Sequence, residues 1–260
     1  MHENAPLAFS ACVAAAAATM LGSFTVFKAK ESNARLLSFG LAFAGGAMVY
    51  ISLVEIFWKS MSDFSKIYED QIAYSYATGS FFLGIVLLVA VDRLIPNPHN
   101  ALEPDPRENR PHLKRVGLIA ALAITAHNFP EGMATFFATL EEPIVGSSLA
   151  IAIAIHNIPE GVSIAVPVFY ATGNKKITIY ACLLSALAEP IGAILGYLVL
   201  APFLSPFVFG SIFGIISGAM VFLSMDELLP TAKRYSRGHD TVYGMITGMG
   251  SIALSLILFR

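Results

Sequence analysis

Eight long apolar runs constrain this chain more than any other feature of its sequence. A helix that spans a lipid bilayer needs ~20 mostly apolar residues. The runs cover residues 7–27, 36–58, 73–95, 116–139, 144–171, 176–201, 207–229 and 241–259. Only 13% of the 260 residues are charged, against ~25% in soluble domains. Because the runs are continuous and do not alternate, we expect an all-α integral membrane protein with eight transmembrane helices, forming one transmembrane domain over residues 1–260.

The basic residues between the runs predict the orientation of the chain, because cytoplasmic connections carry an excess of Lys and Arg. Thirteen of the 16 basic residues fall on one side: Lys28, Lys30, Arg35, Arg93, Arg107, Arg110, Lys114, Arg115, Lys175, Lys176, Lys233, Arg234 and Arg237. Lys59, Lys66 and Arg260 fall on the other. We therefore expect both termini outside the cell and the proline-rich loop 96–115 in the cytoplasm. No basic residue precedes the first run, so we expect it to be retained and not cleaved as a signal peptide.

Two matching hexapeptides place ionisable side chains in the middle of apolar runs. They are His127-Asn128-Phe129-Pro130-Glu131-Gly132 and His156-Asn157-Ile158-Pro159-Glu160-Gly161. An ionisable residue at the centre of a bilayer costs at least ~2.5 kcal/mol and usually marks a functional site. A bound metal cation would compensate the carboxylates most simply.

Helical spacing brings the polar residues of each motif onto one face, since residues three and four apart are neighbours on a helix. That face carries His127, Asn128 and Glu131 in one run, and His156, Asn157 and Glu160 in the next. The two runs form a hairpin, and both motifs lie ~20 Å from its closed end. The motifs can therefore face each other and form a metal site inside the bundle.

Other residues at comparable depth extend the predicted site. Glu189 lies in the sixth run, and Met48 in the second offers a thioether ligand, although methionine is also a routine packing residue. Pro130, Pro159 and Pro190 lack an amide hydrogen, which predicts interrupted helices. Imidazole, carboxylate and amide ligands suit Zn²⁺, Fe²⁺, Mn²⁺, Co²⁺ and Cd²⁺ and not Cu(I). Carboxylates from two helices could bridge two adjacent metal ions.

Four more carboxylates lie on the apolar runs: Glu55 in the second, Asp92 in the third, and Asp226 and Glu227 in the seventh. Each alone reads as an ordinary charge near a helix end. As a series they would line a way in and a way out.

The two hexapeptides strongly resemble the ZIP family of divalent-metal transporters, particularly its short bacterial ZupT-type members. Other motifs carry the resemblance over nearly the whole chain: Gly45-Gly46-x-Met48, Glu189-Pro190-Ile191-Gly192 and Glu227-Leu228-Leu229-Pro230. The resemblance implies a binuclear site. By motif position, His127, Glu131, His156, Glu160 and Met48 would bind one metal. Asn128, Glu131, Asn157, Glu160 and Glu189 would bind its neighbour.

The resemblance also implies a function: uptake of divalent metal ions into the cytoplasm, zinc first and also iron, manganese, cobalt and cadmium. The chain would be a multi-pass protein of a bacterial inner membrane with periplasmic termini. Its partners would be divalent metal ions, the lipid bilayer and a second copy in a homodimer, with no nucleic acid. Spans one, four, five and six would move as a unit against the others. We expect no enzymatic activity and no catalytic cofactor.

Two other functions fit a buried cluster of His and Glu. A membrane-embedded metal-dependent hydrolase would need an open coordination position and a general base, but the sequence has no His-Glu-x-x-His motif. A carrier of protons or monovalent cations would use the His/Glu pairs as a relay.

Overall fold

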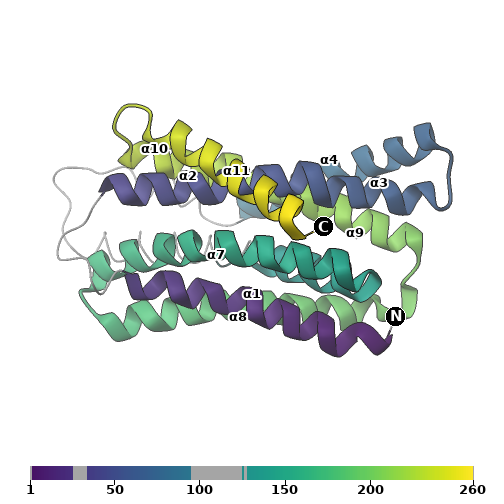
Figure 1. Ribbon diagram of the computed structural model, residues 1–260, viewed down its shortest axis with the longest axis horizontal. Coiled ribbons are helices and arrows are strands. Elements are labelled where there is room, and N and C mark those ends of the chain that lie inside the picture. The colour runs from purple at the N-terminus through teal and green to yellow at the C-terminus, as the bar shows by residue number, and fades with distance from the viewer. Residues whose placement is uncertain (1, 26–33, 95–124, 126–127, 260) are drawn as a thin grey trace.

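The computed structural model describes residues 2–25, 34–94, 125 and 128–259, and all regular structure in these ranges is helical (Figure 1). The elements are η1 (His2–Asn4), α1 (Ala5–Thr25), α2 (Ala34–Ile51), η2 (Ser52–Ile56), α3 (Phe57–Ser65), α4 (Asp70–Leu94), α7 (Pro143–Thr172), α8 (Lys175–Leu200), η3 (Ala201–Phe203), α9 (Pro206–Leu223), η4 (Ser224–Leu228), α10 (Leu229–Tyr235) and α11 (Asp240–Phe259). Residues 128–141 form a further helix. The predicted all-α class is confirmed.

Seven helical segments of the described chain are long and apolar enough to cross a membrane. They are formed by α1, α2 with η2 and α3, α4, α7, α8 with η3, α9 with η4 and α10, and α11. The remaining predicted span, 116–139, is described from residue 128 onwards, apart from residue 125. The predicted loop 96–115 lies outside the described residues.

Two spans extend beyond their predicted ends, and each contains a π-helical turn. The second continues through η2 to Ser65 and not 58, and the seventh continues through η4 to Tyr235 and not 229. The extensions are too polar to count as apolar runs. Charged residues such as Lys59 and Asp63 are nevertheless buried there.

The prediction of interrupted helices is wrong for two of the three prolines. Helix α7 continues through Pro159, and α8 continues through Pro190. A proline removes only one backbone hydrogen bond, and the helices packed around it can hold the geometry.

The helices pack into two bundles, and in Figure 1 the first bundle lies below the second. The first bundle contains α1, residues 128–141, α7 and α8. The second bundle contains α2, η2, α3, α4, α9, η4, α10 and α11. Helix α7 lies at the boundary, where it contacts α2 and α11.

Glycines let the helices within each bundle approach until backbone meets backbone. A β-carbon on Gly161 would overlap the carbonyl of Thr19, and one on Gly22 would overlap that of Ile158. Helices α1 and α7 therefore each use a glycine to pack closely against the backbone of the other. The same holds for Gly132 with Glu189 and Gly192 with Phe129, for Gly46 with Met245 and Gly248 with Phe43, and for Gly84 with Ile215 and Gly218 with Phe81. In the described residues, each glycine that another helix approaches closely meets a helix of its own bundle. Small residues commonly allow such packing in membranes.

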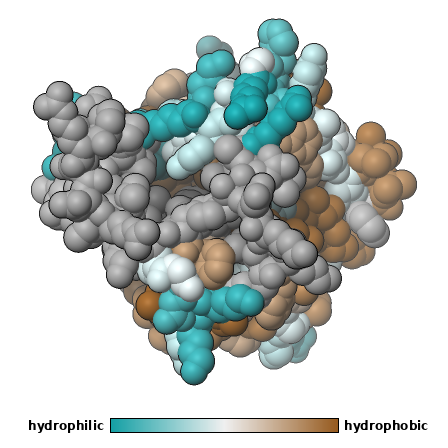
Figure 2. Space-filling view, turned by 90° about the vertical axis from the view of Figure 1, so that its left-hand side faces the viewer, coloured by the Kyte–Doolittle hydropathy of each residue, from teal (hydrophilic) through white to brown (hydrophobic). Residues whose placement is uncertain are grey.

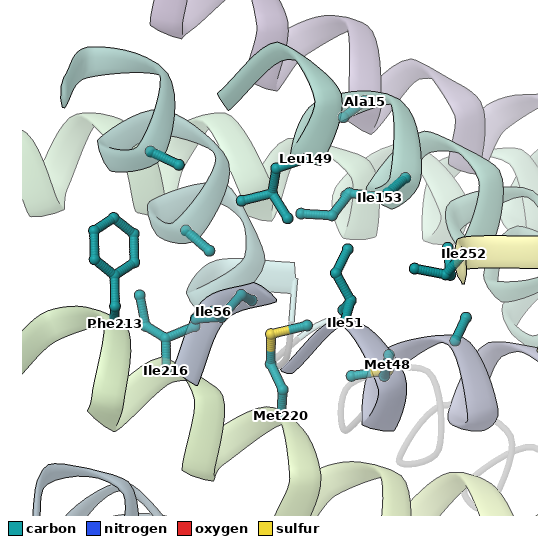
Figure 3. Packing of buried hydrophobic residues seen from close by; sticks show 14 of the residues in the cluster. Ala15, Met48, Ile51, Ile56, Leu149, Ile153, Phe213, Ile216, Met220 and Ile252 are labelled. Atoms are coloured by element: carbon teal, nitrogen blue, oxygen red, sulfur yellow. The ribbon is translucent and has the colours of Figure 1, made fainter. Parts of the chain in front are cut away.

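The boundary between the bundles is built differently, from larger apolar side chains. Figure 3 shows Met48 and Ile51 of α2 near Ile153 of α7, with Ile252 of α11 beside them. Farther along the boundary, Phe137 meets Phe209 edge to face, at 6.1 Å between ring centroids. At these positions the bundles meet through side chains.

The two ends of the molecule differ in their charges. One end contains the turn between α7 and α8 and the turn between α10 and α11, and hydrophilic groups gather at this end in Figure 2. Exposed Lys175, Lys176, Lys233, Arg234 and Arg237 belong to these turns. The N-terminus lies at the opposite end, as does the turn between α3 and α4 (Figure 1).

Candidate metal site

Glu131, His156 and Glu160 form a compact group of potential metal ligands in the first bundle. One ligand atom from each lies within 4.8 Å of the other two, and all three residues are buried. Glu131 comes from the helix of residues 128–141, and the other two come from α7. The predicted facing of the two motifs is thus present in the described part of the chain.

Helix α7 carries His156, Asn157 and Glu160 on one turn, and residues at both of its ends define where the helix begins and stops. Pro143 occupies its first turn, where a missing amide hydrogen costs nothing. Gly173 ends it at a φ of 63°, a left-handed conformation that glycine adopts without strain. The residues between are largely apolar, so the polar turn lies in the middle of a helix that otherwise faces lipid or core.

A hydrogen bond joins the two motifs directly. The Nε2 atom of His156 lies 3.0 Å from Oε1 of Glu131. The other ring nitrogen, Nδ1, has no hydrogen-bond partner among the described residues. A buried polar atom without a partner costs ~1–3 kcal/mol. A nitrogen in this position is suited to bind a metal ion.

Glu189 joins the group from α8. The Asn157 amide donates hydrogen bonds to Oε1 of Glu189 at 2.6 Å and to the carbonyl of Ala15 at 2.9 Å. Glu189 also lies close enough to Glu131 and Glu160 for their charges to repel one another. Helices of the whole first bundle therefore converge on the predicted carboxylates.

Asn128 is oriented by a residue that the sequence reasoning missed. Its amide nitrogen donates to the Ser185 hydroxyl at 3.1 Å and to the Ser185 carbonyl at 3.2 Å. Asn128 also lies next to the Glu160 carboxylate. With its nitrogen engaged, Asn128 is left with a carbonyl oxygen that has no hydrogen-bond partner within the described ranges. Ser185 precedes Glu189 by one helical turn, and this spacing was the available signal.

Two more ligands were predicted, His127 and Met48. His127 lies outside the described residues. Met48 is fully buried in the apolar cluster at the boundary between the bundles, next to Ile51 in Figure 3. Its helix, α2, packs against α7.

Three of the four carboxylates predicted along a path lie in the two π-helical turns. Glu55 is part of η2, and Asp226 and Glu227 are part of η4, whereas Asp92 is part of α4. Turns of this kind occur frequently at functional sites. Both turns belong to the second bundle, and the path itself stays a prediction.

Three buried carboxylates so close together strongly favour a divalent cation. Glu131, Glu160 and Glu189 are each at most 1% exposed. Buried charges require pairing or a metal ion, and like charges in one site repel. Imidazole nitrogen with carboxylate and amide oxygens matches the preferences of Zn²⁺ and related ions.

Comparison with known proteins agrees with this chemistry. The family model described as "ZIP Zinc transporter" matches residues 105–256. A protein of Neisseria meningitidis serogroup B named "Zinc transporter ZupT" is 62% identical over 99% of this chain and 97% of its own length. The proteins of that name from Xanthomonas axonopodis pv. citri and Oceanobacillus iheyensis are 58% and 44% identical, over 99% and 98% of this chain and 96% and 99% of their own lengths. The chain therefore belongs to the ZIP family of metal transporters.

Proposed function

We propose that this protein takes up zinc across the inner membrane of a bacterium into the cytoplasm. The buried group of Glu131, His156 and Glu160 carries the proposal, because it offers nitrogen and oxygen ligands inside a membrane-spanning bundle. Membership of a transporter family makes the chain a transporter and not an enzyme. Nothing in the fold or the comparisons supports the hydrolase alternative.

The proposed site holds two adjacent zinc ions. Glu131 and Glu160 would bridge them, because one carboxylate comes from each of two facing helices. His156, His127 and Met48 complete one position, and Asn128, Asn157 and Glu189 complete the other. The free carbonyl oxygens of the two asparagines support the second position. Fe²⁺, Mn²⁺, Co²⁺ and Cd²⁺ accept the same ligand types and are proposed as secondary substrates.

The proposed orientation has the N-terminal end of the molecule in the periplasm and the 96–115 loop in the cytoplasm. It is supported by exposed basic residues at the opposite end, including Lys175 and Lys233. A +2 charge that crosses 100 mV towards a negative interior gains ~4.6 kcal/mol. The membrane potential therefore favours uptake.

We infer that the ion crosses when the first bundle moves against the second, all within one transporter domain. Backbone contacts at glycines hold each bundle together, whereas at the boundary apolar side chains such as Met48, Ile51 and Ile153 meet and can slide. The proposed homodimer rests on the family resemblance.

Zinc uptake into proteoliposomes tests the proposal. We expect saturable uptake by the wild type and a loss of at least ~10-fold in Glu131→Gln, since even indirect disturbance of a metal site costs about that much. Glu69→Gln, at an exposed position, is the matched control and should transport normally. Equal uptake by all three proteins would show that the ion does not use this site.

A further inference from the structure

A network of ion pairs joins the two bundles at the N-terminal end of the molecule. Lys59 forms an ion pair with Oε2 of Glu141 at 2.8 Å, and Lys66 donates a hydrogen bond to Oε1 of Glu141 at 2.7 Å. Glu142 lies 3.4 Å from Lys59, and Asp63 lies 2.7 Å from Lys66. The lysines and Asp63 belong to α3 and the turn after it, in the second bundle. In the first bundle, Glu141 ends the 128–141 helix and Glu142 connects it to α7.

This network differs from the other ion pairs of the described chain. Arg35 pairs with Asp240 inside the second bundle, and His156 pairs with Glu131 inside the first. Within the described ranges, the ion pairs that cross the boundary are those of Lys59 and Lys66 with Glu141 and Glu142. These crossing ion pairs lie at the N-terminal end of the molecule.

The central pair is largely shielded from water. The side chains of Lys59 and Glu141 are 9% and 12% exposed, and the Lys59 ammonium also lies over the Phe213 ring. Burial alone would raise the pKa of Glu141, but the hydrogen bonds from Lys59 and Lys66 outweigh it and lower the pKa. Glu141 is therefore ionised at neutral pH, and removing one partner would leave an uncompensated charge.

The surroundings allow the network to open as well as to close. Lys66 and Glu142 are 43% and 52% exposed, so water reaches the edge of the network. When the bundles separate there, the charges gain hydration in place of their partners. The network thus has two discrete states: a closed state in which the charges pair with each other, and an open state in which water hydrates them. The sliding apolar boundary beneath it has no such preference.

We propose that Lys59, Lys66, Glu141 and Glu142 form a clasp that closes the N-terminal end of the boundary and opens once in each transport cycle. The inference rests on the proposed movement of the two bundles and adds the residues that gate it. Glu141 is the centre of the clasp because it holds both lysines. Asn4 donates to the Leu140 carbonyl at 3.2 Å, so the N-terminal segment would move with the glutamates.

Distances between spin labels test the clasp without any zinc transport. Leu7→Cys with Ile72→Cys reports across the boundary, and Leu7→Cys with Leu198→Cys reports within the first bundle; all three positions are exposed. Cys12 and Cys182 are buried and should label poorly. Lys59→Met and Glu141→Gln remove the central pair at similar side-chain size. Lys176→Met, exposed at the other end, is the control.

We expect the cross-boundary distance to shift to a longer main peak in Lys59→Met and Glu141→Gln, and to stay unchanged in Lys176→Met. The distance within the first bundle should stay unchanged in all proteins. An unchanged cross-boundary distance would overturn the clasp, as would a simultaneous change of both distances, which would mean general loss of the fold. Because zinc is absent, this result is independent of whether Glu131→Gln loses uptake.

Discussion

At the scale of single residues, the metal site depends on side chains that orient the ligands as well as on the ligands. The Asn128 and Asn157 nitrogens are both engaged, one by Ser185 and the other by Ala15 and Glu189. An amide whose nitrogen is held presents its oxygen in a fixed direction. Ser185 is in this sense a positioning residue for Asn128.

Ser185→Ala should weaken zinc binding about fivefold, because it removes one hydrogen bond worth ~1 kcal/mol and leaves Asn128 held by the Ser185 carbonyl alone. Ser185→Thr keeps the hydroxyl and should restore the affinity. Competition titration against a zinc-binding dye measures the effect, with Ser211→Ala, near the surface, as the control. A purely structural role for Ser185 would instead lower the thermal stability and leave the affinity unchanged.

The sequence predicted the ligands within each helix better than the contacts between helices. Spacing of three and four residues correctly placed Asn128 with Glu131 and His156 with Glu160, because helix geometry alone sets that relation. Ser185 and the Ala15 carbonyl were missed, because they depend on which helices become neighbours. Met48 was proposed from its depth, but depth does not say which way a side chain points.

At the scale of helices, reciprocal glycine contacts determine which helices stay together. Glycines four residues apart, such as Gly244 and Gly248, can be seen in the sequence, but their spacing does not identify the partner helix. Small residues are frequent in membrane helices in general. Likewise, the π-helical turns at Ser52–Ile56 and Ser224–Leu228 left no signal in the hydrophobic pattern.

Gly161→Ala should destabilise the protein, because the added methyl group would overlap the Thr19 carbonyl and push α1 away from α7. Overpacking of this kind costs ~1–3 kcal/mol. Gly79→Ala is the matched control, since a β-carbon there meets nothing within 4 Å and alanine favours the helix. Thermal unfolding in detergent should show a lower Tm for Gly161→Ala only. Equal Tm values would mean that α1 and α7 are less tightly packed than the structure shows.

At the scale of the whole molecule, the number and order of apolar runs predicted the architecture because a bilayer permits few alternatives. The division into two bundles is a property of tertiary packing, and only the family resemblance anticipated it. The sequence did not indicate the proposed clasp, because it too depends on tertiary packing. Lys59 and Lys66 were used only to predict the orientation of the chain, and nothing in their separation from Glu141 along the sequence indicates that they meet it.

The most direct test of the metal site is zinc X-ray absorption on the purified protein in detergent. We expect imidazole nitrogen and carboxylate oxygen at ~2.0–2.2 Å from zinc, together with the thioether sulfur of Met48 as a further ligand. His156→Ala should lose part of the imidazole signal, whereas His239→Ala, exposed on the turn before α11, should leave the spectrum unchanged. Identical spectra for the wild type and His156→Ala would contradict a zinc site built on Glu131, His156 and Glu160.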